Sequence, residues 1–253
     1  MKILVSNDDG INALGLKILV KELSKIAEVY VCAPDGQRSS NSHHYTISGK
    51  IKISEEYIEG AKKSYALSGT PADCAHIGIK VLFPDVDMVV SGINQGPNLS
   101  TDFIYSGTIA AAREAFILGI PSIAVSLASF ECNNYAYSAK ITRRILCEYY
   151  NDLDNKNYFL NINVPGLFEK NIKGILVCDK VAKLNYIDNY VFEKTNAGIY
   201  LCVGPTNVNI EMDENDLSCD VAAVEHGYVS VTPLYNSHIC YDYLSNTIKC
   251  IKD

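Results

Sequence analysis

The chain has 253 residues, of which 48% are hydrophobic and 20% are charged, and its mean hydropathy is +0.04. This composition indicates one large globular unit and excludes a disordered, collagen-like or coiled-coil protein. With 22 Lys and Arg against 29 Asp and Glu, the net charge is −7, and no basic cluster offers a footprint for a nucleic-acid polymer. A phosphate-bearing ligand must therefore be small and be held by a local cation or by a group of N–H donors.

The first two-thirds of the chain alternates segments typical of strands and of helices. Short apolar runs predict buried strands, and apolar residues at helical spacing predict the helices between them. Thr70, Pro71 and Asp73 begin one helix as an N-cap, a first-position proline and an acidic third residue. In chain order we expect a strand at 3–6, a helix at 14–26, a strand at 28–33, a hairpin excursion at 45–58, a helix at 70–82, a strand at 87–91, a helix at 106–118, a strand at 122–126, a helix at 136–150 and a strand at 158–163.

Strands separated by helices of this length predict βαβ crossovers, and therefore an α/β protein with a mostly parallel sheet covered on both faces. After residue 165 the pattern changes. Residues 173–212 have the pattern of β-hairpins, a short helix at 219–226 leads into a strand at 228–232, and 235–253 form an extended tail. So many apolar residues in a β-rich arm predict that the arm packs on a second subunit.

The cysteines and the N-terminus predict a cytoplasmic protein. Nine cysteines are an odd number without a C-x-x-C pair, and several, such as Cys32 and Cys147, lie in apolar stretches. We therefore expect buried free thiols in a reducing compartment. Residues 1–9 lack the continuous apolar region of a signal peptide, and the longest uncharged run, between residues 114 and 131, is broken by a glycine and a proline, so we expect no contact with a membrane.

Polar residues collect where the predicted strands end, in the segments 7–10, 34–42, 92–98 and 127–134. Because ligands of an open parallel sheet bind outside the carboxyl ends of its strands, the fold should bring the first three of these segments to one rim. This convergence is the main argument from the residues that the rim is a binding site.

Two adjacent carboxylates, Asp8 and Asp9, follow the first strand directly. At about 4 Å, two such charges repel by about 4 kcal/mol at an effective dielectric constant of 20, so a partly buried rim needs something to neutralise them. A hard divalent cation suits oxygen ligands of this kind. The same residues also fit a simple turn and helix start. The amide oxygens of Asn94 and Asn98 are further candidates, either to coordinate a metal or to orient a phosphate.

Ser106 and Thr108 begin a helix, where hydroxyls and unpaired N–H groups form an anion site, although simple N-capping is equally consistent. In the loop after the second strand, Ser39 is a candidate oxygen ligand, and Arg38 can pair with a phosphate or with a structural carboxylate. For His43 and His44 a direct role is the less favoured interpretation, and His76 is expected to pack within its helix.

Three other site types are not supported. The chain has no Gly-x-Ser-x-Gly motif for a nucleophilic serine, and its glycine spacing does not match a P-loop. The first strand–helix turn carries acids where a nicotinamide enzyme would bind pyrophosphate.

The chain resembles the SurE (survival protein E) family of nucleotidases. The matching segments occur in the same order over most of the chain: Asn7-Asp8-Asp9-Gly10-Ile11, Ala33-Pro34-Asp35 with Arg38-Ser39, Gly69-Thr70-Pro71-Ala72-Asp73-Cys74, Ser91-Gly92-Ile93-Asn94 with Gly96 and Asn98, Tyr105-Ser106-Gly107-Thr108 with Ala111-Ala112-Arg113-Glu114, Gly119-Ile120-Pro121 with Ala124-Val125-Ser126, and Asp220 with the segment 227–234.

The resemblance implies a Rossmann-like, doubly wound core and one SurE-like domain over 1–253. The core would comprise about 1–165 plus 218–234, and the β-hairpin excursion and C-terminal arm about 166–217 and 235–253. The arm is exchanged between subunits of a homodimer or homotetramer in this family.

The resemblance also implies a metal-dependent phosphomonoesterase that hydrolyses nucleoside 5′-monophosphates, with 3′-monophosphates and short polyphosphate as further substrates in the family. Its metal ligands correspond to Asp8, Asp9, Ser39 and Asn94, which would hold one Mg²⁺ or Mn²⁺ per subunit. Its phosphate-contacting positions correspond to Asn98, Ser106, Gly107 and Thr108.

For catalysis we expect Asp8, Asn98 and Ser106 to act together. Asp8 would either deprotonate the attacking water or attack the phosphorus itself, and we favour water because Asp8 does not begin the Asp-x-Asp pattern typical of the haloacid dehalogenase phosphatases. Two alternatives remain: a nucleotide-sensing or metal-binding module without turnover, and a metal-independent α/β hydrolase. The sequence leaves open the base preference, the 5′ or 3′ preference, the physiological metal and the number of subunits.

Overall fold

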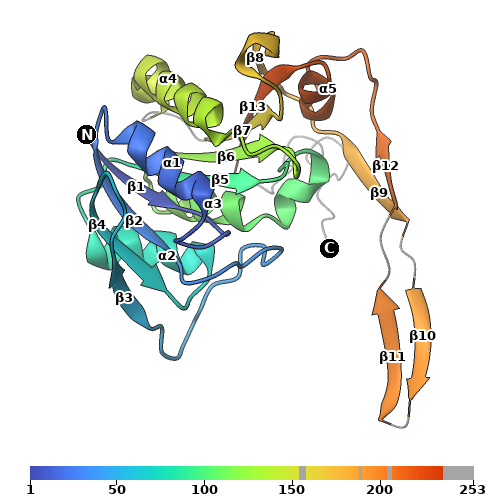
Figure 1. Cartoon of the computed structure of the whole chain (residues 1–253), viewed down its shortest axis with the longest axis horizontal. Helices are drawn as coiled ribbons and strands as arrows, with labels where there is room; N and C mark the ends of the chain where they lie inside the picture. The colour runs from blue at the N-terminus through green and yellow to red at the C-terminus, as the bar shows by residue number, and fades with distance from the viewer. Residues whose placement is uncertain (154–157, 188–189, 196, 204–206, 236–253) are drawn as a thin grey trace, which may run out of the picture.

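A computed structural model describes residues 1–153, 158–187, 190–195, 197–203 and 207–235 (Figure 1). Its main feature is a nine-stranded sheet in the order β3-β4-β2-β1-β5-β6-β7-β13-β8. The six strands from β4 to β7 in this order are parallel, whereas β3 and β13 run antiparallel to their neighbours β4 and β7. The strands are β1 (Lys2–Ser6), β2 (Glu28–Pro34), β3 (Ile53–Glu56), β4 (Ala61–Leu67), β5 (Met88–Gln95), β6 (Ser122–Ala128), β7 (Phe159–Pro165), β8 (Gly174–Val177) and β13 (Tyr228–Leu234).

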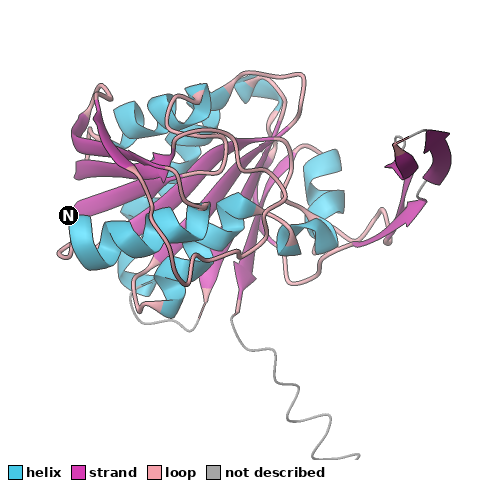
Figure 2. Cartoon of the chain, turned by 90° about the horizontal axis from the view of Figure 1, so that it is seen from below, coloured by secondary structure: helices cyan, strands magenta, loops and turns pink. Residues whose placement is uncertain are grey.

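Helices cover both faces of this sheet, as Figure 2 shows from below. Helices α1 (Leu14–Leu23) and α4 (Tyr135–Leu153) cover one face, and α2 (Pro71–Ile77) and α3 (Gly107–Ile117) cover the other. Strand β1 shows the reason, because Ile3 and Val5 belong to the hydrophobic cluster under α1 and α4, whereas Leu4 belongs to the cluster under α2. The predicted Rossmann-like, doubly wound α/β fold is therefore confirmed.

The chain order creates a switch point beside β1. From β1 the chain passes through α1 to β2 on one side, and it later returns to β5 on the other side. Gly15 of α1 lies so close to the end of β5 that a Cβ there would be 2.1 Å from the carbonyl oxygen of Ile93. The carboxyl ends of β1 and β5 diverge at this point, which is where ligands bind in such sheets.

Most predicted elements are present, with three corrections. The helix at 70–82 has the expected Thr70–Asp73 capping box, but its α-helical part ends at Ile77 and a π-helical turn, Gly78–Leu82, follows. The hairpin expected at 45–58 is formed by β3 and β4 instead, because the partner strand lies beyond the predicted range. Strand β5 continues to Gln95, so the glycine-rich segment begins inside the strand, where its pairing with β6 is irregular.

Beyond β8 the arm is built from two antiparallel pairs, β9 (Lys183–Ile187) with β12 (Asn207–Glu211) and β10 (Tyr190–Thr195) with β11 (Gly198–Val203). Figure 1 shows these pairs extending away from the sheet, and helix α5 (Asp220–Glu225) then returns the chain to β13. Apolar side chains on β10 and β11, such as Phe192, are largely exposed. Packing of the arm on a second subunit stays a prediction, and residues 236–253 of the predicted tail lie outside the described part.

Within the described residues all cysteines are free thiols. Cys32 is buried as predicted, but Cys147 is exposed, because it lies on the outer side of α4 rather than against the sheet.

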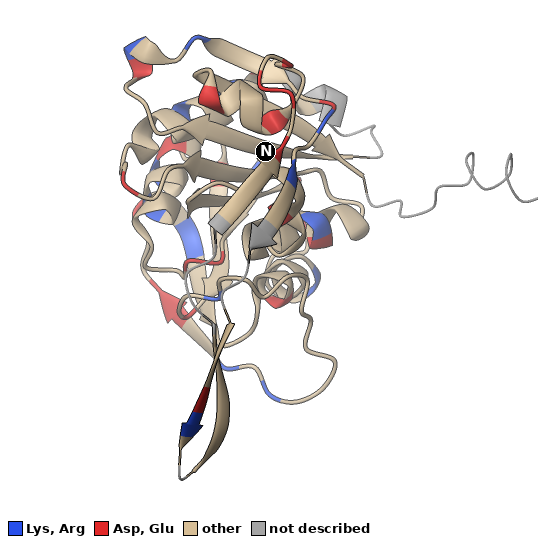
Figure 3. Cartoon of the chain, turned by 90° about the vertical axis from the view of Figure 1, so that its right-hand side faces the viewer, with Lys and Arg blue, Asp and Glu red and all other residues tan. Residues whose placement is uncertain are grey.

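Among the residues that the structure describes, no helix is both long and apolar enough to cross a membrane. Basic and acidic residues are interspersed along the elements in Figure 3.

Candidate functional site

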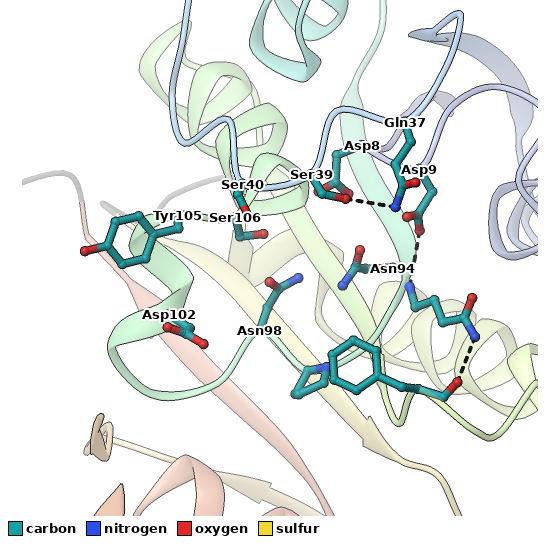
Figure 4. A pocket seen from close by; sticks show the side chains of 13 residues that line it. Asp8, Asp9, Gln37, Ser39, Ser40, Asn94, Asn98, Asp102, Tyr105 and Ser106 are labelled. Atoms are coloured by element: carbon teal, nitrogen blue, oxygen red, sulfur yellow. Dashed lines mark hydrogen bonds between the residues drawn. The ribbon is translucent and has the colours of Figure 1, made fainter. Parts of the chain in front are cut away.

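The polar segments predicted to share a rim surround one cavity of about 910 Å³ at the carboxyl ends of β1 and β5 (Figure 4). Acidic, hydroxyl and amide side chains line its interior, and two aromatic rings lie at its edge. The lining contains no Lys or Arg. The residues that line it are Asp8, Asp9, Gln37, Ser39, Ser40, Asn94, Gln95, Pro97, Asn98, Asp102, Tyr105, Ser106 and Phe130.

Asp8 is the most unusual group of the cavity, because the residue is only 5% exposed and the residues that line the cavity include no positive side chain to pair with it. The Thr108 hydroxyl donates a hydrogen bond to its Oδ1. Burial raises the pKa of Asp8 to about 6, although the Thr108 hydrogen bond acts in the opposite direction and the nearby Asp9 charge adds to the rise. A buried carboxylate in this situation favours a bound cation.

Asp9 lies beside Asp8 and is half-buried. Burial also raises its pKa, and the backbone N–H of Gln95 partly offsets this by donating to Asp9 Oδ2 at 3.2 Å. The end of β5 thus holds the second carboxylate in place from the far side of the switch point.

Ser39 and Asn94 complete the group of oxygen atoms. The Ser39 hydroxyl accepts a hydrogen bond from Gln37 Nε2 at 3.0 Å. Asn94 Nδ2 donates to the Gly96 carbonyl at 2.9 Å, so this bond engages the amide nitrogen of Asn94 and not its oxygen. Figure 4 shows Asp8, Asp9, Ser39 and Asn94 around one part of the cavity. Two carboxylates, one hydroxyl and one amide oxygen are all hard donors, so these residues fit Mg²⁺ or Mn²⁺.

A cluster of three or more His, Cys, Asp or Glu side chains placed to hold a metal does not occur in the described part of the chain. The four oxygen-bearing residues are compatible with this finding, because only Asp8 and Asp9 belong to those residue types. They would therefore form a site of the kind in which solvent supplies the remaining ligands, as Mg²⁺ prefers.

Asn98 is held by a buried network that the sequence analysis missed. Its backbone N–H donates to Asn163 Oδ1 at 2.8 Å, and its side chain donates to Ser126 Oγ at 2.8 Å. Its carbonyl accepts from Asn161 Nδ2 at 2.7 Å and from Asn163 Nδ2 at 3.1 Å. Two asparagines at alternate positions of the otherwise apolar strand β7 were the available signal, since buried amides need partners.

Ser106 caps helix α3, because its hydroxyl accepts from the Ile109 N–H at 3.2 Å. The next residue, Gly107, lies so close to Asp8 that a Cβ there would be 2.7 Å from the Asp8 Cβ. Thr108 is fully buried and its hydroxyl is directed to Asp8 rather than into the cavity. The start of α3 therefore supports Asp8 and also presents backbone N–H groups beside the cavity.

The other candidates of the sequence analysis lie outside the cavity lining. Arg38 pairs with a structural carboxylate, since its Nη2 is 2.8 Å from Asp35 Oδ1. His43 and His76 both bond to Glu114, and the side chain of His44 is exposed. His76 lies within helix α2 as expected, but it also makes a hydrogen bond to Glu114 in addition to packing.

The edge of the cavity carries two exposed aromatic side chains. The Phe130 side chain is 74% exposed, yet its segment is held because Gln95 Nε2 donates to the Phe130 carbonyl at 3.1 Å. Tyr105, directly before the Ser106 cap, is more than half exposed. Apolar rings that line a polar cavity and remain open to solvent provide stacking surfaces for a planar ligand.

Comparisons with known proteins find similar sequences and a similar fold. The family model "Survival protein SurE" matches residues 3–186. The chain is 40% identical to "5'-nucleotidase SurE" of Clostridium beijerinckii, with 98% of each chain covered, and 42% identical to the protein of the same name from Clostridium botulinum (strain Alaska E43 / Type E3), with 93% of each covered. Among solved structures, the SurE protein from Aquifex aeolicus is similar, with a TM-score of 0.82, 34% identity and 98% of each chain covered.

Proposed function

The chain belongs to the SurE family, and from this premise we propose that it is a 5′-nucleotidase, a metal-dependent phosphomonoesterase that converts nucleoside 5′-monophosphates to nucleoside and phosphate. The names of the Clostridium relatives support the activity. The observation that carries the proposal is the buried Asp8 carboxylate, which has no cationic side chain among the described residues that line the cavity and lies next to Asp9 and to the N-terminus of α3. Such a site takes a cation and an anion together.

Asp8, Asp9, Ser39 and Asn94 would hold one Mg²⁺ or Mn²⁺ per subunit. When bound, the ion supplies positive charge to the phosphate and makes water a better nucleophile. The hydroxyl of Ser39 and the amide oxygen of Asn94 add no charge, so two carboxylates leave the site electrically balanced before the substrate arrives.

The phosphate would lie against the start of α3. The Ser106 side chain, the Asn98 amide and the backbone N–H groups of Gly107 and Thr108 donate to its oxygens and bind them more strongly as charge redistributes in the transition state. The hydroxyl and the backbone N–H of Thr108 both interact with the Asp8 carboxylate, so we assign Thr108 a phosphate contact only through an N–H that it shares with Asp8. The Asn161 and Asn163 bonds fix Asn98 before the substrate binds, which avoids reorganisation during the reaction.

Asp8 would take the proton from the attacking water. The Thr108 hydroxyl occupies Asp8 Oδ1 and so fixes the direction of the carboxylate. An attack by Asp8 itself would give a phosphorylated enzyme, so rapid quenching with ³²P-labelled substrate separates the two routes: no protein-bound label is expected if water attacks.

The proposed activity is tested by phosphate release from AMP with Mn²⁺ and after treatment with EDTA. We expect turnover with Mn²⁺, loss of turnover with EDTA, and recovery when Mn²⁺ is restored. Binding of AMP without phosphate release would instead identify a nucleotide-sensing module, and turnover that survives EDTA would identify a metal-independent hydrolase.

We further propose that the nucleobase stacks on Phe130. Stacking on an aromatic side chain contributes about 1–3 kcal/mol per base, so Phe130→Ala should raise the KM for AMP about tenfold at nearly constant kcat. Ribose 5-phosphate, which has no base, should be hydrolysed by this variant as well as by the wild type. Phe168→Ala is the matched control, because the Phe168 side chain is also 74% exposed but does not line the cavity. Equal KM values for AMP in wild type and Phe130→Ala would contradict this assignment.

The same family premise leads us to propose 3′-monophosphates and short polyphosphate as further substrates and a homodimer or homotetramer as the assembly. The exposed apolar side chains of β10 and β11 support the assembly, because they would be buried between subunits. We also propose that 1–253 form one domain, with a core of about 1–165 plus 218–234, and that it works in the cytoplasm.

A further inference from the structure

The carboxylate of Glu114 in helix α3 bridges two histidines near the candidate site. Glu114 of α3 is only 8% exposed, and each of its oxygens has one histidine partner. His43 Nε2 is 2.8 Å from Oε2, and His76 Nδ1 is 2.8 Å from Oε1. The ring of Tyr45 packs against that of His76 at a tilt of 58°, with ring centroids 5.0 Å apart. Glu114, His43 and His76 do not line the cavity, and the proposed mechanism does not use them.

In this cluster the Glu114 carboxylate accepts hydrogen bonds and the two histidines donate them. Burial alone would raise the pKa of Glu114, but the hydrogen bonds from His43 and His76 outweigh it and hold the pKa below its usual value. An ionised carboxylate only accepts hydrogen bonds, so His43 carries a proton on Nε2 and His76 carries one on Nδ1. Glu114 therefore connects the loop around His43 to both α2 and α3.

The loop that contains Ser39 is held in place by contacts with other parts of the chain. The backbone N–H of Arg38 donates to the Asp8 carbonyl at 2.7 Å, and the backbone N–H of Ser42 donates to the Tyr105 carbonyl at 3.0 Å. Between these two contacts the chain has no secondary structure, and Ser40 and Ser42 have positive φ angles of 57° and 51°. Left-handed backbone at residues other than glycine costs energy and persists only when the surroundings hold it.

Helix α3 contacts the candidate site at two levels. Its first turn supports Asp8 through Thr108, and about two turns further along, Glu114 holds His43. One rigid element therefore fixes two parts of the site that are far apart in sequence, the Asp8 carboxylate and the loop with Ser39.

We propose that Glu114 is a positioning residue that acts through His43: it holds the segment 38–43 on α3, and thereby places the Ser39 hydroxyl relative to Asp8. His76 is the second support, which keeps the Glu114 carboxylate turned toward the loop. This inference rests on the proposed function only in taking Ser39 as a metal ligand.

Two histidine variants test the proposal in the full-length protein. His43→Ala should weaken Mn²⁺ binding, measured by titration calorimetry, by about tenfold, as expected when a group that orients a metal ligand is removed. His43→Gln should restore most of the affinity, because the glutamine amide can donate from nearly the same place as Nε2. Glu114→Ala should resemble His43→Ala. His44→Ala is the matched control, since this residue is adjacent to His43, its side chain is exposed, and its hydrogen bonds in the described structure are made by its backbone.

Amide hydrogen exchange of the metal-free protein gives an independent measurement. Residues 39–43 should exchange faster in His43→Ala and Glu114→Ala than in wild type and His44→Ala, while the strands of the sheet keep their protection. Unchanged exchange, or Mn²⁺ affinity equal to wild type in His43→Ala, would overturn the proposal. If wild type itself binds no Mn²⁺, the proposed function fails, and exchange alone then decides whether Glu114 holds the loop.

Discussion

Asp8→Asn is expected to lower kcat/KM for AMP with Mn²⁺ by at least about a thousandfold, because it removes both a charged metal ligand and the proton acceptor of the proposed mechanism. Asparagine keeps the size of the side chain and its oxygen can still accept from the Thr108 hydroxyl, so the fold should remain. Steady-state phosphate release over a range of Mn²⁺ concentrations measures the effect and shows whether additional metal restores any activity.

Asp85→Asn is the control for this prediction. It makes the same chemical change at an exposed carboxylate that pairs with Lys2 on the surface, far from the cavity lining. Its kcat/KM should match that of the wild type. Activity of Asp8→Asn within tenfold of wild type would show that Asp8 neither binds the metal nor accepts the proton.

The second large effect concerns the stability of the metal-free protein against pH. Burial raises the pKa of Asp8 from 3.8 to about 6 in the folded state. A group whose pKa is raised by folding contributes its full stability below the unfolded pKa and loses it as the pH rises through the folded value. The metal-free wild type should therefore lose about 2 kcal/mol between pH 4 and pH 7 through this residue alone.

Asp8→Asn isolates that contribution, since asparagine does not titrate and the remaining groups are shared. The free energy of unfolding of the variant minus that of wild type, from urea denaturation in EDTA, should increase by about 2 kcal/mol over this pH range. At pH 7 in EDTA the variant should be the more stable protein. Saturating Mn²⁺ should make the wild type the more stable one, because the ion binds and stabilises only the wild type. If the difference in the free energy of unfolding stays constant from pH 4 to pH 7, then Asp8 is either exposed in the folded protein or paired with a positive charge.

Local sequence determined the elements and the position of the site. The capping box at Thr70 and the apolar runs of β1, β2, β6 and β7 depend on neighbouring residues, and they were predictable for that reason. The rim was predictable because parallel strands end at one edge, whichever residues follow them. Errors arose where pairing between segments decided the outcome, as in the hairpin of β3 and β4.

Tertiary structure alone decided how the side chains of the site are supported. His43 bonds to Glu114 across 71 residues, and Asn98 bonds to Asn163 across 65. A residue's own sequence context shows that a buried polar group needs a partner, but it does not show which distant group becomes that partner. That choice depends on how α3 and β7 pack beside the loops, and therefore on the whole sheet order. The sequence by itself thus brought the candidate ligands to one rim, and folding supplied the contacts that hold them.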